Sequence, residues 1–237
     1  MKGVEDSVMI RFTMLLSIFF VTLVSNAQTI KGLPSIPTSS GSLGFKGSVG
    51  AGFADFKTQS PASDFRLERG TYFTGALERP FNVMHLHLTF GLNYMAAEGQ
   101  ANYDYSNLST STAYSMDDID FKAQMFEVTL GLKFKLIEEY WFRPYIEGGG
   151  IGSYNNVNYG SRISDLNSVG ADFKRKDVIM GSGYYAEAGF EIQFNPKFGV
   201  RLAARQANVQ TKKLETLGNR PVLMQNEIYY LSMLFGM

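Results

Sequence analysis

The acidic and basic residues of this chain recur at spacings that could pair them. Glu187 and Glu191 lie four residues apart before an Asn-Pro-Lys tripeptide, and Arg201 and Arg205 lie four residues apart after it. If the tripeptide is a tight turn that pairs residue 194 with residue 198, Glu191 falls opposite Arg201 and Glu187 falls opposite Arg205. Such pairs neutralise charge where water is excluded, so the predicted chemistry is ion pairing rather than catalysis.

Further charges share the polar side of the same pattern. Glu147 can reach Lys133 diagonally across a second predicted turn, at residues 137–140. Gly131 and Gly149 lie on the same side, where small residues leave room for long charged ones. The predicted charge network comprises Glu127, Lys133, Arg143, Glu147, Glu187, Glu191, Arg201 and Arg205.

Two histidines, His85 and His87, lie two residues apart and could act as a metal pair or as catalytic groups. Both lie beside a predicted turn at residues 79–83, where Glu78 is available as a hydrogen-bond partner for His85. We therefore expect structural, hydrogen-bonded histidines. The sequence offers no nucleophile with a neighbouring base, and it predicts no catalytic residue, no metal and no cofactor.

Two clusters lie in predicted loops. The segment 115–120 offers Asp117, Asp118 and Asp120, which could hold a divalent cation. A solvated acidic loop is the favoured interpretation, because neither EF-hand spacing nor a glycine turn accompanies them. The second cluster is Lys174, Arg175 and Lys176, which could contact anionic phosphate groups or serve solubility alone.

The elements that position these residues are β-strands with a period of two. In the stretch 126–136, apolar residues occupy every second position from Phe126 to Leu136, with Glu127 and Lys133 on the alternate row. The same pattern predicts strands at 43–56, 67–78, 84–96, 121–136, 141–154, 178–194, 198–208 and 226–237. Tight turns at 79–83, 137–140 and 195–197 alternate with long polar loops at 57–66, 97–120, 155–177 and 209–224.

The alternation alone fits a soluble barrel with an apolar core and a membrane barrel with an apolar outside. Charges of both signs, interleaved with glycine, suit a narrow filled lumen better than a wet surface. Aromatic residues also gather at the two ends of the apolar face: Tyr140, Trp141, Phe142, Phe194, Phe198 and Phe235 on the turn side, and Phe53, Tyr94, Tyr154 and Tyr184 on the loop side. We therefore predict that the apolar face contacts lipid.

Composition and the first residues agree with an exported protein. The 237 residues carry no net charge, which argues against nucleic-acid binding, and they contain no cysteine, which excludes disulfides and thiol chemistry. Arg11, the apolar run 12–24 and the small residues before Gln28 predict a signal peptide at residues 1–27, cleaved after Ala27, with Met1 or Met9 as the start. An uncleaved helix is the alternative, although the run is short for a membrane span. Residues 28–42 would be a periplasmic lead-in, and 43–237 the barrel.

The strand at 141–154, with its aromatic-Pro-Tyr start and glycine-rich middle, and the final strand of alternating hydrophobic residues resemble the small outer-membrane barrels of OmpA type and OmpW type. The chain departs from them by ending in Gly236-Met237 instead of an aromatic residue. The resemblance implies an all-β, eight-stranded, antiparallel up-and-down transmembrane β-barrel, with short periplasmic turns and long extracellular loops, in a Gram-negative outer membrane. It also implies contact with lipopolysaccharide, insertion by the barrel insertion machinery, and a monomer.

Three functions follow from that fold. The first is a structural and interaction scaffold with a filled, charge-paired lumen. The second is a narrow conduit of OmpW type for small or hydrophobic solutes. The third is a lipid-modifying outer-membrane enzyme, which is disfavoured because His85 and His87 lie at the turn end of the predicted strands, away from the outer leaflet.

Overall fold

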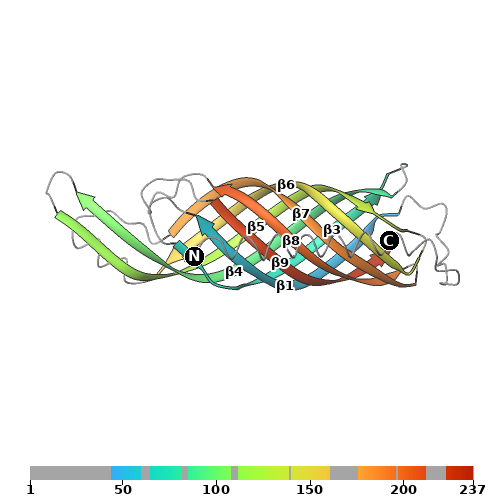
Figure 1. Ribbon diagram of the computed structural model, residues 1–237, viewed down its shortest axis with the longest axis horizontal. Coiled ribbons are helices and arrows are strands. Elements are labelled where there is room, and N and C mark those ends of the chain that lie inside the picture. The colour runs from blue at the N-terminus through green and yellow to red at the C-terminus, as the bar shows by residue number, and fades with distance from the viewer. Residues whose placement is uncertain are drawn as a thin grey trace, which may run out of the picture.

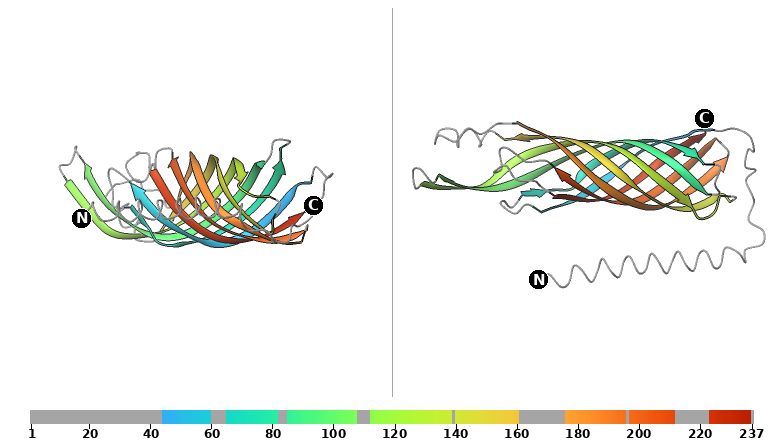
Figure 2. Two further views of the ribbon diagram at one scale, coloured as in Figure 1. Left: turned by 45° about the vertical axis from the view of Figure 1, so that its right-hand side comes forward. Right: turned by 90° about the horizontal axis from the view of Figure 1, so that it is seen from above.

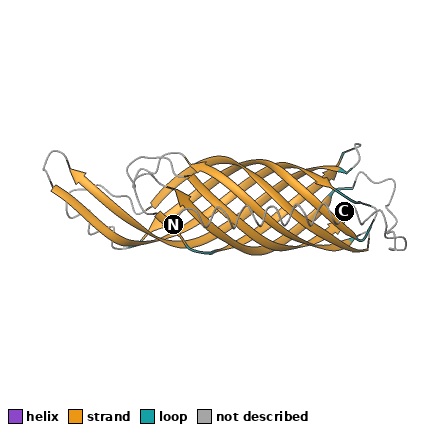
Figure 3. Ribbon diagram, viewed as in Figure 1, coloured by secondary structure: helices purple, strands orange, loops and turns teal. Residues whose placement is uncertain are grey.

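The alternating segments form one continuous antiparallel sheet in the computed structural model of the protein, and the sheet closes into a barrel (Figure 1). The structure describes residues 44–59, 65–81, 85–107, 112–138, 140–160, 176–195, 197–211 and 223–236. The predicted signal peptide and lead-in, and two of the three residues of the basic cluster, Lys174 and Arg175, lie outside these ranges. The described part of the chain contains no helix that could span a membrane (Figure 3).

Eight strands surround the barrel, as the sequence predicted. The strands are β1 Lys46–Gln59, β2 Phe65–Leu67, β3 Gly70–Pro80, β4 Leu86–Asn107, β5 Thr112–Lys135, β6 Phe142–Tyr159, β7 Lys176–Asn195, β8 Phe198–Thr211 and β9 Leu223–Gly236. The short β2 and the longer β3 pair with successive parts of β4, so together they fill the place of the second predicted strand. β1 pairs with β3, each strand from β3 to β8 pairs with the next one along the chain, and β9 pairs with β1 to complete the ring.

The register tilts the strands against the barrel axis. Paired positions lead from Val49 through β3, β4 and β5 to Gly152 in β6. In the other direction they lead through β9, β8 and β7 to Phe142, ten residues earlier on the same strand. This offset along β6 is the stagger of the barrel. With eight strands, it corresponds to strands tilted by roughly 40° against the barrel axis and to an interior that side chains can fill.

The two ends of the barrel differ. We call the end with the β3–β4, β5–β6 and β7–β8 connections the turn end, and the opposite end the loop end. The β7–β8 connection is tighter than predicted: Phe198 pairs with Asn195 instead of Phe194, because the register shifts between Gln193 and Asn195. This bulge absorbs one residue at the turn and leaves the register farther along the hairpin as predicted.

Strands β4 and β5 extend far beyond the other strands at the loop end (Figures 1 and 2). The prediction of a loop at 97–120 is wrong, because the two strands stay paired through Asn107 and Thr112, with one register shift between Ala101 and Tyr103. The backbone of Asp117, Asp118 and Asp120 therefore lies in β5. The segment was read as a loop because it lacks the apolar face that signals a membrane strand, and a hairpin standing in water needs no such face.

Candidate functional site: the charged lumen and its apolar cap

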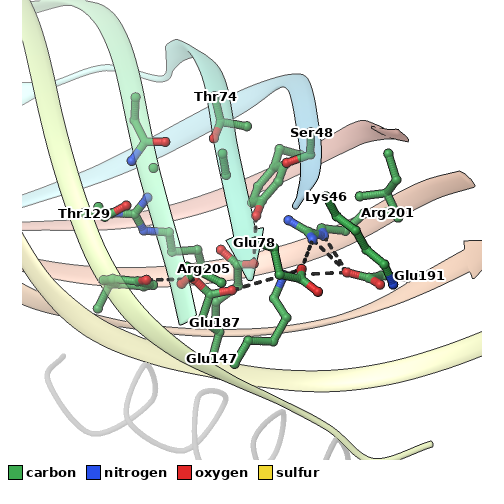
Figure 4. Close-up of a pocket in the computed structure, with 18 of the residues that line it drawn as sticks. Lys46, Ser48, Thr74, Glu78, Thr129, Glu147, Glu187, Glu191, Arg201 and Arg205 are labelled. Carbon is green, nitrogen blue, oxygen red and sulfur yellow. Dashed lines mark hydrogen bonds and ion pairs between the residues drawn. The ribbon is translucent and has the colours of Figure 1, made fainter. Parts of the chain in front are cut away.

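The charged face of the strands lines the lumen. Phe126 and Leu130 are 50% and 58% exposed on the outer surface, whereas Glu127 is 3% exposed and Lys133 is fully buried. The central prediction from the sequence, an inverted barrel with charges inside, is therefore confirmed. Charged side chains from β3, β5, β6, β7 and β8 meet in the narrow interior and form one network (Figure 4).

Two glutamates in the turn-end half of the lumen, Glu78 and Glu191, contact the same three cations. The Nζ atom of Lys133 lies 3.0 Å from Glu78 Oε2 and 3.5 Å from Glu191 Oε1. Lys135 contacts Glu78 and lies 3.1 Å from Glu191 Oε2. Arg201 Nη2 donates to Glu191 over 2.7 Å and to Glu78 over 3.0 Å. Because each carboxylate faces three cations, charge is neutralised by the cluster and not by separate pairs.

The register predicted for the β7–β8 hairpin is confirmed, but only one of its two side-chain pairs forms. Glu191 is opposite Arg201 and bound to it, whereas Arg205, although opposite Glu187, reaches across the lumen to Glu127 at 2.9 Å. Tyrosines replace Arg205 as the partners of Glu187: two hydroxyl groups each donate to its Oε1 over 2.7 Å. In a narrow lumen, long side chains from strands that are not neighbours can meet, so register alone does not decide the partner.

Two other predicted members of the network have different surroundings. Glu147 lies directly opposite Lys133 and 3.3 Å from it, so the predicted diagonal contact is a direct one. Arg143 is buried beside the turn end, where its Nε donates to the Tyr140 carbonyl over 2.9 Å and its Nη1 to Gln193 over 3.5 Å.

Four inward-facing tyrosines complete the network, and the sequence analysis missed them. Tyr145 and Tyr230 hold Glu187, Tyr185 donates to Glu147 over 2.7 Å, and Arg205 Nη1 donates to the Tyr72 hydroxyl over 3.2 Å. Each lies on the row of its strand that faces inward, so alternation would have found it: from charges on the same row for Tyr72, Tyr145 and Tyr185, and from the apolar outward row for Tyr230. Aromatic residues were assigned to the lipid face by type, although a tyrosine hydroxyl suits a buried carboxylate.

Little empty space remains among these side chains. The cavity between the two halves of the charge network has a volume of about 30 Å³, room for about two water molecules (Figure 4). Its wall includes Lys46, Glu78, Glu147, Glu187, Glu191, Arg201 and Arg205. At this level the lumen is filled.

The histidines occupy two different environments at the turn end. His87 is buried in the lumen, with Nδ1 at 3.1 Å from Glu78 Oε1 and Nε2 in contact with Glu138. His85 lies in the turn with a φ of 64°, and its ring meets the edge of Phe134 outside the lumen. The prediction that Glu78 would bind His85 is therefore wrong, because the left-handed backbone turns that ring away and leaves Glu78 to His87.

The described members of the predicted loop clusters are exposed. Asp120 accepts a hydrogen bond from Gln100 over 3.2 Å, and Lys176 begins β7. Among the described residues, no group of three or more His, Cys, Asp or Glu side chains is arranged to hold a metal ion.

The comparisons with known proteins agree with this architecture. The family model described as outer membrane protein beta-barrel domain matches residues 18–227. The chain belongs to this family. Among solved structures, it is similar to Neisserial surface protein A, with a TM-score of 0.50, 13% identity, and coverage of 81% of this chain and 96% of that one.

Two other outer-membrane barrels show lower similarity. OprG from Pseudomonas aeruginosa has a TM-score of 0.47 and 14% identity, covering 81% of this chain and 95% of its own. Ail, the attachment invasion locus protein of Yersinia pestis, has a TM-score of 0.41 and 12% identity, covering 80% and 98%. A search of curated proteins found no match. At 13% identity, the similarity to Neisserial surface protein A supports the fold alone.

Membership of this family places the protein in the outer membrane, where the short turns of such barrels face the periplasm. Strand β5 then shows where the membrane ends. From the turn end, its inward row runs Lys135, Lys133, Gly131, Thr129 and Glu127, and then Met125, Ala123 and Phe121. Its outward row changes in the opposite sense, from Phe134, Leu132, Leu130, Val128 and Phe126 to Gln124, Lys122 and Asp120.

Neighbouring strands of the outer membrane barrel change at the same level. On β4, Met95 and Ala97 continue an inward row that began with His87 and Asn93, while Glu98 continues an outward row of apolar residues. The change coincides with the loop-end aromatic residues Phe53, Tyr94, Phe126, Tyr154, Tyr184 and Tyr229. Strand β7 departs from the pattern, because Val178 and Met180 remain apolar and exposed beyond Tyr184.

An aromatic girdle marks the boundary between hydrocarbon and head groups. Beyond it, the barrel has mainly polar residues outside and a cluster of apolar residues inside, among which Asn155, Asp177 and Asn226 are buried polar residues. We call this buried cluster the apolar cap, and it consists of Ala54, Leu67, Met95, Ala97, Phe121, Ala123, Met125, Val157, Ile179, Met224 and Ile228. The lumen is thus filled by charge pairs at membrane level and by the apolar cap beyond it.

Proposed function

We propose that the protein is a closed structural scaffold of the outer membrane that holds a rigid β-sheet module, built on the β4–β5 hairpin, outside the membrane. The apolar cap is the observation that carries this proposal. A conduit requires a wettable path, whereas the cap places Met95, Met125 and Met224, each at most 3% exposed, across the interior at the loop end. Behind it, the charge network leaves space for about two water molecules.

The outer surface of the module suits contact with polar head groups and solutes. Two pairs of its described exposed charges lie across neighbouring strands: Lys122 with Glu98 at 2.7 Å, and Arg69 with Asp55 at 2.7 Å. Such exposed pairs stay hydrated and add little to stability. In this proposal the protein is a monomer surrounded by outer-membrane lipid and lipopolysaccharide, inserted by the barrel insertion machinery, with no enzymatic role.

Planar-bilayer recording of the purified full-length chain separates the scaffold from the conduit. The scaffold predicts no stepwise current at any salt concentration, even when folded, heat-modifiable protein is shown to be in the bilayer. A double variant, Glu78→Ala with Arg201→Ala, removes two large side chains from the network but leaves the apolar cap in place, so it is expected to stay silent as well. Stepwise currents from the wild-type chain would overturn the scaffold and favour the conduit.

Excision of residues 103–116 tests the module itself. In the described structure, residues 103–107 pair with residues 112–116 across the hairpin, and their backbone pairs with no third strand. The scaffold model predicts that the shortened barrel inserts and unfolds like the wild-type chain, because the hairpin tip serves outward contacts. Loss of insertion or of heat-modifiable folding would show that the tip is needed for the barrel instead.

A further inference from the structure

The aromatic residues at the loop end follow the pairing of the strands. Phe73 of β3 pairs with Tyr94 of β4, Tyr94 pairs with Phe126 of β5, and Phe126 pairs with Tyr154 of β6. The ring centroids lie 6.5 Å apart for Phe73 and Tyr94, and 4.9 Å apart for Tyr94 and Phe126. These four residues therefore form one continuous aromatic row on the outer surface from β3 to β6.

This aromatic row rises around the barrel, because paired residues in tilted strands do not share the same height along the barrel axis. The stagger of ten residues is divided among eight strands, so each pairing step from β3 towards β6 moves about 1.25 residues, or about 3 Å, towards the loop end. Three such steps separate Phe73 from Tyr154. Tyr154 therefore lies about 9 Å farther towards the loop end than Phe73.

On β8 the polar surface begins closer to the middle of the membrane. The outward row of β8 runs Phe198, Val200, Leu202 and Ala204, and then Gln206, Asn208 and Gln210. Pairing leads from Gln206 through Ala186 of β7 and Gly148 of β6 to Leu132 of β5. Because these three steps descend by about four residues in total, Gln206 lies at the height of Val128 on β5.

Two sides of the barrel thus present opposite chemistry at the same height. Val128 and Phe126 of β5 face outward and are 49% and 50% exposed, whereas Gln206 and Asn208 present amide groups at these two heights. Strand β9 continues the polar patch, because Gln206 pairs with Glu227. Hydrocarbon offers no hydrogen-bond partner, so a leaflet of even thickness that covered Val128 would also enclose unfavourable amide groups on β8.

The turn end does not share this slope. Pairing leads from Val200 through Ile192 to Phe142, and after correction for the two steps Phe142 lies at about the height of Phe198. Tilting the barrel would level the loop end only by raising the β8 side. That movement would draw the exposed Lys197, next to Phe198, towards the hydrocarbon, where a charge is unfavourable.

We propose that the barrel imposes an uneven outer leaflet on the surrounding membrane, thin beside β8 and β9 and thick beside β5 and β6. The apolar outward row covers residues 198–204 on β8, about 15 Å along the axis, and residues 142–154 on β6, about 30 Å. A typical transmembrane barrel presents an apolar band of about 25 Å. The bilayer accommodates a shorter row by local thinning. Lipid head groups and water therefore reach Gln206 and Asn208 at the height where acyl chains cover Val128.

The change from the thick to the thin side falls between β7 and β8. Met180 and Val178 on the outward row of β7 remain 61% and 52% exposed beyond Tyr184, so β7 extends the thick side. The neighbouring outward residues of β8 are amides, since Gln210 pairs with Ser182 and Asn208 pairs with Tyr184. Acyl chains beside this pair of strands therefore meet a step in the boundary of the outer leaflet.

Nitroxide labels at matched heights test the proposal, because the chain contains no cysteine. Gln206→Cys and Asn208→Cys on β8 are compared with Val128→Cys and Phe126→Cys on β5, each in the full-length protein in palmitoyl-oleoyl phospholipid bilayers. We expect the labels on β8 to collide with a water-soluble nickel complex, and the labels on β5 to collide with oxygen dissolved in lipid. A label at Lys197→Cys should collide with the nickel complex. Heat-modifiable mobility on gels confirms that each variant is folded.

Each other outcome overturns the uneven leaflet. Oxygen contact at 206 and 208 equal to that at 128 and 126 would show a leaflet of even thickness. Shielding of 206 and 208 from both reagents would show that a protein partner, such as a second copy of this chain, covers β8. Oxygen contact at 197, with nickel contact at 206, would show that the barrel tilts instead. None of these results depends on whether the lumen conducts, so the proposal stands or fails separately from the scaffold.

Discussion

Removing the charge of Glu191 should destabilise the barrel strongly. Glu191 is 1% exposed and faces Arg201 at 2.7 Å, Lys135 at 3.1 Å and Lys133 at 3.5 Å. Glu191→Gln keeps the volume but leaves Glu78 as the remaining carboxylate for Lys135 and Arg201, and Glu78 with Glu147 for Lys133. Breaking a buried ion pair from one side costs about 3–5 kcal/mol, and Glu78 offsets a part of that, so we expect the lower end, about 3 kcal/mol. This corresponds to about a hundredfold in the unfolding equilibrium.

The assay is urea-induced unfolding of the full-length chain in lipid vesicles, followed by fluorescence of Trp141 and by heat-modifiable mobility on gels. The matched control is Glu227→Gln, which breaks a pair of 3.0 Å between Lys57 and Glu227 on the outer surface. That pair is partly exposed and is worth about 0.2–1 kcal/mol. Equal effects of the two substitutions, or an unchanged midpoint for Glu191→Gln, would refute the argument that the buried charges hold the barrel together.

Three further predictions use the same unfolding assay. Leu132→Arg places a charge in the hydrocarbon and should cost about 2–4 kcal/mol, whereas Gln124→Arg on the same strand should cost about 0–1 kcal/mol, since it lies beyond the aromatic girdle; similar costs would contradict the membrane boundary. Met125→Ala opens a hole in the apolar cap and should cost about 2–5 kcal/mol, and a smaller effect would mean a loosely packed cap. A Cβ atom at Gly131 would collide with the Tyr185 hydroxyl, while one at Gly152 meets no atom within 4 Å, so Gly131→Ala should cost about 1–3 kcal/mol and Gly152→Ala nothing measurable.

The fold could be predicted because the membrane imposes a simple pattern on each strand. Lipid outside and a narrow polar lumen inside require apolar and polar residues to alternate strictly, as from Phe126 to Leu132. That alternation indicates the number of strands, their register and which face of each strand contacts lipid. The prediction failed where this constraint ends. Above the girdle the hairpin of β4 and β5 has no lipid to face, so its polar outer row was read as a loop.

The sequence predicted which residues line the lumen better than it predicted which of them pair with one another. The register placed Glu187 opposite Arg205, yet the side chain of Arg205 crosses the lumen to Glu127. A side chain in a closed barrel can contact residues of any strand at its level. Which contact forms depends on side-chain lengths and directions, which the alternation of residues along the sequence does not show. The apolar cap escaped notice for a related reason, because the inward row was taken to be polar along its whole length.

The measurement that tests the central claim most directly is a nitroxide scan of β5. The chain contains no cysteine, so single cysteines at residues 120 to 135 can be labelled one at a time in the full-length protein in lipid bilayers. We predict that labels at 126, 128, 130, 132 and 134 collide with oxygen dissolved in lipid, that labels at 120, 122 and 124 collide with a water-soluble nickel complex, and that the odd positions collide with neither. Oxygen contact at 127 and 133, or lipid contact that continues through 122, would contradict the account.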